Sequence, residues 1–130
     1  ITDRFSVGGF ISFQNAEDRN TELSYAGTSD WLNGVNFDFR LTENLELSGN
    51  FQYVGDRSRE AGDSRANLDG YQTLNLSLEA RDLFNSGFEL DFDVVNALDE
   101  EIREPARVNT YIDDYPRAGR AMFVKLSKLF

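Results

Sequence analysis

Residues 34–54 of this 130-residue chain read GVNFDFRLTENLELSGNFQYV. Apolar side chains occupy every second position on both sides of Thr42-Glu43-Asn44: Val35, Phe37, Phe39 and Leu41 come before it, and Leu45, Leu47, Phe51 and Tyr53 come after it. A period of two residues is typical of a β-strand with one apolar and one polar face. Asn suits the positive φ of a tight turn. The segment therefore predicts a hairpin of two amphipathic strands.

The same alternation recurs in four further segments, residues 5–14, 73–80, 88–94 and 121–130, so the sequence predicts six strands. The connections alternate in length: residues 42–44 and 82–87 are short, whereas residues 16–33, 57–70 and 97–118 are long and polar. Short turns at one end of a sheet and long loops at the other are typical of outer-membrane β-barrels. A soluble β-sandwich also alternates apolar and polar residues, but it has no reason to sort its loops by end.

The predicted strands keep nearly all their charged residues on one face. In a barrel wall, the apolar face is expected to contact lipid and the polar face to line the lumen. The residues predicted to face lipid are Phe37, Phe39, Leu45, Leu47, Leu74, Leu76, Leu78, Leu90 and Phe92. The residues predicted to face the lumen are Asp38, Arg40, Glu46, Glu79, Glu89, Asp91 and Asp93. The last three carboxylates would also suit a cation site or an acid–base pair, but a wet lumen wall is the favoured interpretation.

The composition excludes several classes of function. The chain has 13 Lys+Arg and 23 Asp+Glu, a net charge of −10, so we expect no nucleic-acid partner, because phosphate binding needs clustered positive charge. It has no Cys and no His, which excludes disulfides, thiol nucleophiles and histidine bases. Zinc sites built from these ligands are excluded as well. We therefore expect no enzymatic activity and no cofactor.

Two of the long loops carry most of the remaining charge. Residues 97–118 hold six carboxylates, which would suit calcium, but interspersed arginines favour a solvated loop with ion pairs inside it. Residues 57–70 have almost nothing to bury. Arg57, Arg59 and Arg65 in this loop would suit lipopolysaccharide phosphates or an anionic ligand, yet the surrounding acids favour a mixed, solvated loop. Trp31 is interpreted as an interfacial anchor.

Three segments near the end of the chain carry a resemblance to a known family. Residues 115–130 read YPRAGRAMFVKLSKLF, residues 93–106 read DVVNALDEEIREPA, and YVGDR (53–57) and LDGY (68–71) flank a loop. In this order and spacing they resemble the last strands of TonB-dependent outer-membrane receptors, which commonly finish with a Pro-x-x-Gly-Arg turn, an alternating strand and a terminal Phe. The sequence departs from the family pattern at Ala97 and Leu98, where Leu and Phe are usual, and at Lys128, where an apolar or aromatic residue is usual.

The resemblance implies an all-β fold, an antiparallel transmembrane β-barrel to which residues 1–130 contribute about six C-terminal strands as part of one barrel domain. It implies the outer membrane of a Gram-negative bacterium and active uptake of a scarce nutrient, such as a siderophore, cobalamin or a saccharide. Implied partners are lipid, lipopolysaccharide, TonB through a plug domain outside these residues, and the barrel-assembly machinery. The implied assembly signal is Met122, Val124, Leu126 and Phe130. The alternatives are a soluble, acidic β-sandwich binding module and a subunit of an oligomeric pore.

Overall fold

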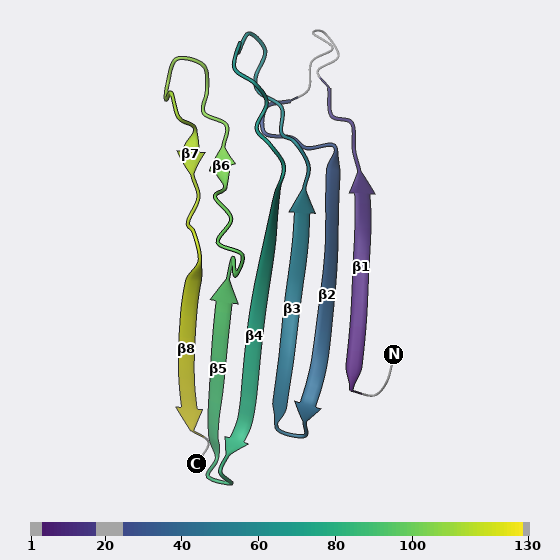
Figure 1. Cartoon of the computed structure of the whole chain (residues 1–130), viewed down its shortest axis with the longest axis vertical. Coiled ribbons are helices and arrows are strands. Elements are labelled where there is room, and N and C mark those ends of the chain that lie inside the picture. Colours follow the sequence, from purple (N-terminus) through teal and green to yellow (C-terminus); the bar gives the residue numbers. More distant parts are fainter. Residues whose placement is uncertain (1–3, 18–24, 129–130) are drawn as a thin grey trace.

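A computed structural model of the chain describes residues 4–17 and 25–128. Six strands form one antiparallel sheet in the order β1-β2-β3-β4-β5-β8 (Figure 1). Their bounds are β1 Phe5–Phe13, β2 Trp31–Thr42, β3 Leu45–Val54, β4 Tyr71–Leu83, β5 Phe88–Val95 and β8 Ala121–Lys128. The six predicted strands are confirmed, and each pairs with the next of them along the chain.

Short turns and long connections lie at opposite ends of the sheet, as the sequence predicted (Figure 1). We call these the short-turn end and the long-loop end. The register of β2 against β3 shifts between Arg40 and Thr42, next to the first short turn. The register of β4 against β5 shifts between Ala80 and Leu83, next to the second. Such irregularities bend a strand where its pairing ends.

The connection predicted as a polar loop over residues 97–118 contains two further strands. β6 (Arg103–Glu104) and β7 (Tyr115–Pro116) pair antiparallel and extend beyond β5 and β8 at the long-loop end (Figure 1). Between β5 and β6, Asn96 adopts a positive φ of 51° and its side chain bonds to the backbone of Glu100 in both directions. Two-residue strands are too short to produce a periodic pattern, so the sequence did not predict them.

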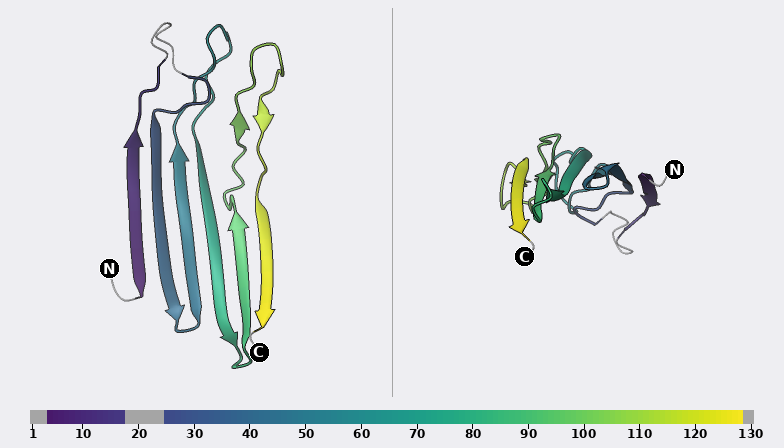
Figure 2. Two further views of the ribbon diagram at one scale, coloured as in Figure 1. Left: turned by 180° about the vertical axis from the view of Figure 1, so that it is seen from behind. Right: turned by 90° about the horizontal axis from the view of Figure 1, so that it is seen from below.

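The sheet is a single layer with both faces open. Seen end-on, the strands follow a shallow arc (Figure 2, right). Of the four buried apolar residues in the described part of the chain, only Ala80 belongs to the sheet, whereas Leu68, Ile102 and Ala106 lie in the long connections. The second sheet of residues 4–17 and 25–128 is the pair β6-β7, which does not pack over the six strands as a β-sandwich would require. These residues include no helix with the length and apolarity needed to cross a membrane.

Two glycines let aromatic rings lie across the sheet. Phe37 is directly opposite Gly49, and a Cβ atom on this glycine would come within 2.4 Å of the ring. Phe10 is directly opposite Gly34, where a Cβ atom would also come within 2.4 Å of the ring. An aromatic side chain over a glycine covers backbone that would otherwise lie open, and it favours one register. These two pairs therefore help to align β1, β2 and β3.

Candidate functional site

Apolar residues on neighbouring strands lie directly opposite one another. One row crosses five strands as Phe39, Leu47, Leu78, Phe92 and Val124. Directly opposite residues project to the same face of a sheet. The nine residues predicted to face lipid therefore share one face, together with Met122, Val124 and Leu126 of β8. We call this the apolar face.

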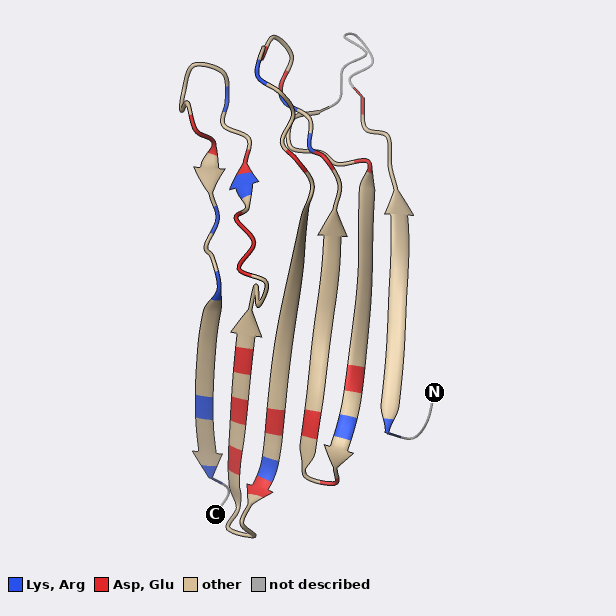
Figure 3. Cartoon of the chain, in the orientation of Figure 1, with Lys and Arg blue, Asp and Glu red and all other residues tan. Residues whose placement is uncertain are grey.

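The residues predicted to face the lumen share the other face, which we call the polar face. One row runs as Arg40, Glu46, Glu79, Asp91 and Lys125, and Asp38, Ser48, Ser77 and Asp93 form the next. The charged residues of the strands gather toward the short-turn end, whereas the other half of the sheet has none (Figure 3). The polar face is thus divided into a charged half and an uncharged half.

Several charges of the polar face are paired with neighbours. The ammonium group of Lys125 lies 2.8 Å from the carboxylate of Asp91. Asp38 accepts a hydrogen bond of 2.8 Å from the Ser6 hydroxyl. The described residues contain no group of His, Cys, Asp or Glu side chains arranged to hold a metal ion. The geometry therefore gives no support to a cation site on β5.

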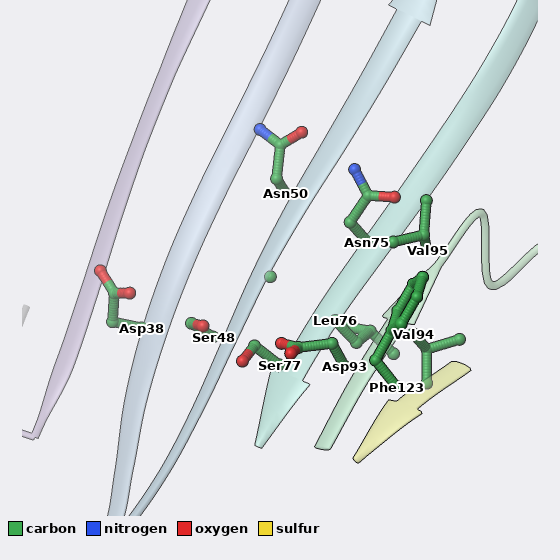
Figure 4. A pocket seen from close by; sticks show the side chains of 11 residues that line it. Asp38, Ser48, Asn50, Asn75, Leu76, Ser77, Asp93, Val94, Val95 and Phe123 are labelled. Atoms are coloured by element: carbon green, nitrogen blue, oxygen red, sulfur yellow. The ribbon is translucent and has the colours of Figure 1, made fainter. Parts of the chain in front are cut away.

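A hollow of about 490 Å³ lies over the middle of the polar face (Figure 4). The side chains around it include Asp38, Ser48, Asn50, Asn75, Ser77, Asp93 and Phe123. Carboxylate, amide and hydroxyl groups of this kind can hydrogen-bond to water or to a polar solute. Apolar residues line it as well: Leu76, Val94, Val95 and Phe123, of which Phe123 is 57% exposed. The hollow therefore has both polar and apolar walls.

The long connections form a second structured region, which we call the loop cluster: residues 25–30, 55–70 and 96–120. Arg59 donates two hydrogen bonds to Asp114, at 2.7 and 2.6 Å. Asp114 also accepts a bond of 3.0 Å from the backbone amide of Ala106. Arg65 bonds to Asp63 at 2.6 Å and lies 3.4 Å from Asp114. Two connections far apart in the sequence are thus joined through one carboxylate.

The ion pairs predicted inside residues 97–118 are present, but ion pairs also join this loop to residues 57–70, which the sequence did not predict. Asp114 is only 8% exposed and its partners belong to the other loop. Leu68, in the loop predicted to bury almost nothing, is 7% exposed. Ion pairs inside a loop do occur, as between Arg103 and Glu101. The contacts between the loops were not predicted because each loop was considered alone, whereas the sheet brings both loops to the same end.

Hydrogen bonds from arginines favour the ionised form of two carboxylates in the loop cluster, Asp63 and Asp114. Bonds from Arg65 lower the pKa of Asp63 to about 2. Bonds from Arg59 hold the pKa of Asp114 well below its usual range, although burial acts in the opposite direction. The same bonds raise the pKa of Arg59. The network therefore keeps its charges across the physiological pH range.

Arg57 has a structural role that the sequence did not reveal. It is 4% exposed, and its guanidinium donates to the backbone carbonyls of Arg103 at 2.6 Å and Asp69 at 3.3 Å. It also lies 4.7 Å from the centre of the Tyr71 ring, within range of a cation–π contact. Arg57 and Leu68 exchange backbone hydrogen bonds, so the segments YVGDR and LDGY are paired. The guanidinium of Arg57 is therefore held inside the loop cluster by contacts with the protein itself.

Aromatic rings lie at both ends of the apolar face. At the long-loop end, the rings of Phe13 and Trp31 are 4.9 Å apart. At the short-turn end, the ammonium group of Lys128 lies 4.8 Å from the centre of the Phe88 ring. Lys128, where the family usually has an apolar or aromatic residue, thus has an aromatic partner in Phe88. Phe130, predicted to complete the assembly signal, lies outside the described residues.

Comparisons of sequence give no match: neither a family model nor a curated protein matches the chain. Comparisons of structure do match. A mutant form of the ferric enterobactin receptor PfeA from Pseudomonas aeruginosa aligns with 100% of this chain and 20% of its own length, with a TM-score of 0.76 and 16% identity. The siderophore receptor PirA from Acinetobacter baumannii aligns with 95% of this chain and 20% of its own, with a TM-score of 0.71 and 17% identity.

The ferric-catecholate import receptor Fiu from E. coli K12 aligns with 97% of this chain and 19% of its own, with a TM-score of 0.68 and 19% identity. The chain thus spans about a fifth of the length of the receptors that it matches. At these identities the likeness concerns the fold. The six strands, their order and their sorted connections have the fold of part of the β-barrel wall of TonB-dependent outer-membrane receptors.

Proposed function

We propose that this chain forms the last six strands of the barrel of a TonB-dependent receptor, which imports iron–siderophore complexes across the outer membrane of a Gram-negative bacterium. The observation that carries the proposal is the apolar face, which runs across all six strands with no layer over it in the described residues. A face of this extent would associate in water but is stable against acyl chains. The matched receptors act on siderophores according to their names, which favours this nutrient class over cobalamin and saccharides.

The proposal gives each face and each end of the sheet a location. The apolar face contacts lipid and the polar face lines the lumen, and the loop cluster lies outside the cell, where such barrels have their long loops. Trp31 and Phe13 then lie at the outer interface, and Phe88 and Lys128 lie at the inner one. Six strands cannot close a barrel, so further strands pair with the free edges of β1 and β8. Coupling to TonB requires a plug domain, which the described sheet does not supply.

Uptake by a strain that lacks the gene tests the function. We expect import of ⁵⁵Fe bound to a tris-catecholate siderophore to fall to background and to return with a plasmid copy. Import of radiolabelled cobalamin, measured in the same cells, is expected to remain unchanged. If cobalamin import is lost instead, the chain is still part of a transport barrel, but the nutrient is cobalamin and not an iron–siderophore complex. If neither import changes while the protein is present in the outer membrane, the assignment to transport of these nutrients is wrong.

We also propose that β8 is the strand that the barrel-assembly machinery recognises, through Met122, Val124, Leu126 and Phe130. Such recognition adds an edge strand to a neighbouring sheet, and the edge of β8 has no partner in the described sheet. Deleting Phe130 from the full-length protein should sharply lower its level in the outer membrane of cells. Refolding in detergent should lose only about 1–2 kcal/mol, because one interfacial ring is removed. Unchanged levels in cells would contradict the assignment.

A further inference from the structure

We infer that the loop cluster moves as one rigid body and that Asp114 is the positioning residue that joins its two larger loops. The inference rests on the proposed function only in placing this cluster on the side from which a ligand arrives. The contacts themselves concern residues 25–30, 55–70 and 96–120. They predict that these loops do not open and close as separate lids.

The loop cluster consists of a first loop (residues 25–30), a second (55–70) and a third (96–120). The first and second loops are joined through backbone hydrogen bonds. The amide of Gly27 donates to the carbonyl of Ser58 at 2.8 Å, and the amide of Ser58 donates to the carbonyl of Thr28 at 3.0 Å. Arg57 in turn exchanges two backbone bonds with Leu68, at 2.9 and 3.0 Å. Residues 57–58 therefore connect the first loop to both sides of the second. Such pairing restrains both loops in the way that a sheet restrains its strands.

An ion pair at Asp114 joins the second loop (residues 55–70) to the third (residues 96–120). The guanidinium of Arg59 donates a hydrogen bond to each carboxylate oxygen of Asp114. The two side chains are only 9% and 11% exposed. A bidentate arginine–carboxylate pair fixes orientation as well as distance. Because the pair is buried, removal of one partner leaves the other charge without compensation. Separation of the third loop from the second at Arg59 and Asp114 is therefore unfavourable.

Independent contacts reinforce the same junction. Arg65 donates to the backbone carbonyls of Ala106 at 2.8 Å and Tyr111 at 3.2 Å, both in the third loop. The carboxylate of Glu60 accepts a bond from the amide of Val108. Arg57 reaches the carbonyl of Arg103 from below the junction. Separation of the two loops would break all these bonds together, and groups that are linked in this way open cooperatively.

The rigid junction fixes the shape of a pocket between the loop tips. Residues 62–65 of the second loop and residues 108–112 of the third line an open hollow of about 520 Å³. This volume is within the range of small-molecule sites, about 300–1,000 Å³. A ligand that enters here meets walls that are already in place, so it does not have to order them. We therefore expect ligand-driven movement to come from loops other than these.

The absence of Cys from this chain makes spin labelling the direct test. In the full-length protein in detergent, with any cysteines elsewhere replaced, a label at Thr110→Cys is paired with one at Glu43→Cys in the opposite turn. Pulsed electron paramagnetic resonance then gives the distribution of their separation. We expect a narrow distribution, and we expect Arg59→Ala, in the other loop, to widen it about twofold or more. Asp113→Asn is the matched control, since Asp113 is exposed and adjacent to Asp114.

Hydrogen exchange gives a second readout. Arg59→Ala should speed exchange of the Ala106 amide about tenfold, and Asp114→Asn should do the same for amides of residues 58–68. A broad distribution in the unsubstituted protein overturns the inference, and so does loosening confined to the loop that carries the substitution. Neither measurement depends on transport, so a failure here leaves the proposed function standing. Loss of uptake in the gene deletion test likewise has no bearing on these readouts.

Discussion

The sheet and the loop cluster distribute their residues in opposite ways. The sheet contains most of the apolar residues and leaves them open, with Ile11 78% exposed and Val124 67% exposed. The loop cluster has a polar sequence, yet it buries Ile102 to 5% exposure and Arg57 to 4%. The loop cluster therefore has a small core of its own, although Ile112 at its tip is 88% exposed, whereas the sheet presents half of an interface. The apolar face of the sheet therefore needs an apolar partner from outside the described residues.

The strongest test of this contrast places an arginine on the apolar face. If Leu76 lies at the middle of the bilayer, Leu76→Arg should cost about 2–4 kcal/mol in the free energy of unfolding from lipid vesicles. Ser77→Arg is the matched control on the polar face, where Asp93 is directly opposite. It should change stability by less than about 1 kcal/mol. Equal costs at both positions would mean that the two faces do not meet different solvents.

A second test concerns packing inside the sheet. Gly49→Val should force the Phe37 ring from its place, since a Cβ atom would come within 2.4 Å of it. Overpacking of this kind costs about 1–3 kcal/mol. Gly8→Ala is the control, because its Cβ would make an ordinary contact of 3.5 Å with Asn36. Denaturant unfolding in detergent measures both, and similar costs would show that the ring over Gly49 contributes nothing specific.

Acid should separate the two regions. The pKa of Asp63 is lowered to about 2 and that of Asp114 is held still lower, so both carboxylates contribute stability that is present above their unfolded pKa values and is lost as the pH falls through the folded ones. Cleavage by pepsin, which works in acid, measures the change. We expect residues 57–70 and 97–118 to resist at about pH 4 and to be cut near pH 2, while the strands remain intact. Cleavage of these loops already at pH 4 would contradict a network that holds them.

The smallest expected effect is at Lys128. Lys128→Tyr removes the cation–π contact with Phe88 and restores an aromatic residue on the apolar face. The two changes oppose each other, and a cation–π contact contributes about 0.5–1 kcal/mol. We therefore expect refolded stability to change by less than about 1 kcal/mol and assembly in cells to be equal or improved. A large loss on either measure would show that the ammonium group has a role beyond its aromatic partner.

The sheet was predictable because its information is local. The alternation over residues 45–53 predicted β3 to within one residue, and the sorted lengths of the connections predicted which ends lie together. The faces followed from parity alone, since directly opposite residues share a face. Register then aligned charged residues such as Glu79 and Asp91, which no local pattern relates.

The loop cluster was not predictable in the same way. The partners Arg59 and Asp114 are 55 residues apart, and neither loop has a period that would bring them together. The burial of Arg57 depends on Tyr71 and on carbonyl groups, which every residue has, so its sequence context resembles that of an exposed arginine. The one usable signal was the resemblance of YVGDR and LDGY to family segments that flank a loop, and the structure pairs them through Arg57 and Leu68.

β1 begins and β8 ends at the short-turn end (Figure 1). A wall segment with an even number of strands returns to the side from which it started. Under the proposed function, this places the two boundaries of the segment and the turn at Glu43 on the periplasmic side of the membrane, and Ser64 outside the cell. An epitope inserted at Glu43 should therefore be hidden from antibodies added to intact cells, whereas one inserted at Ser64 should be reached. Two insertions in this segment thus report on which side of the membrane each end of the six-stranded sheet lies.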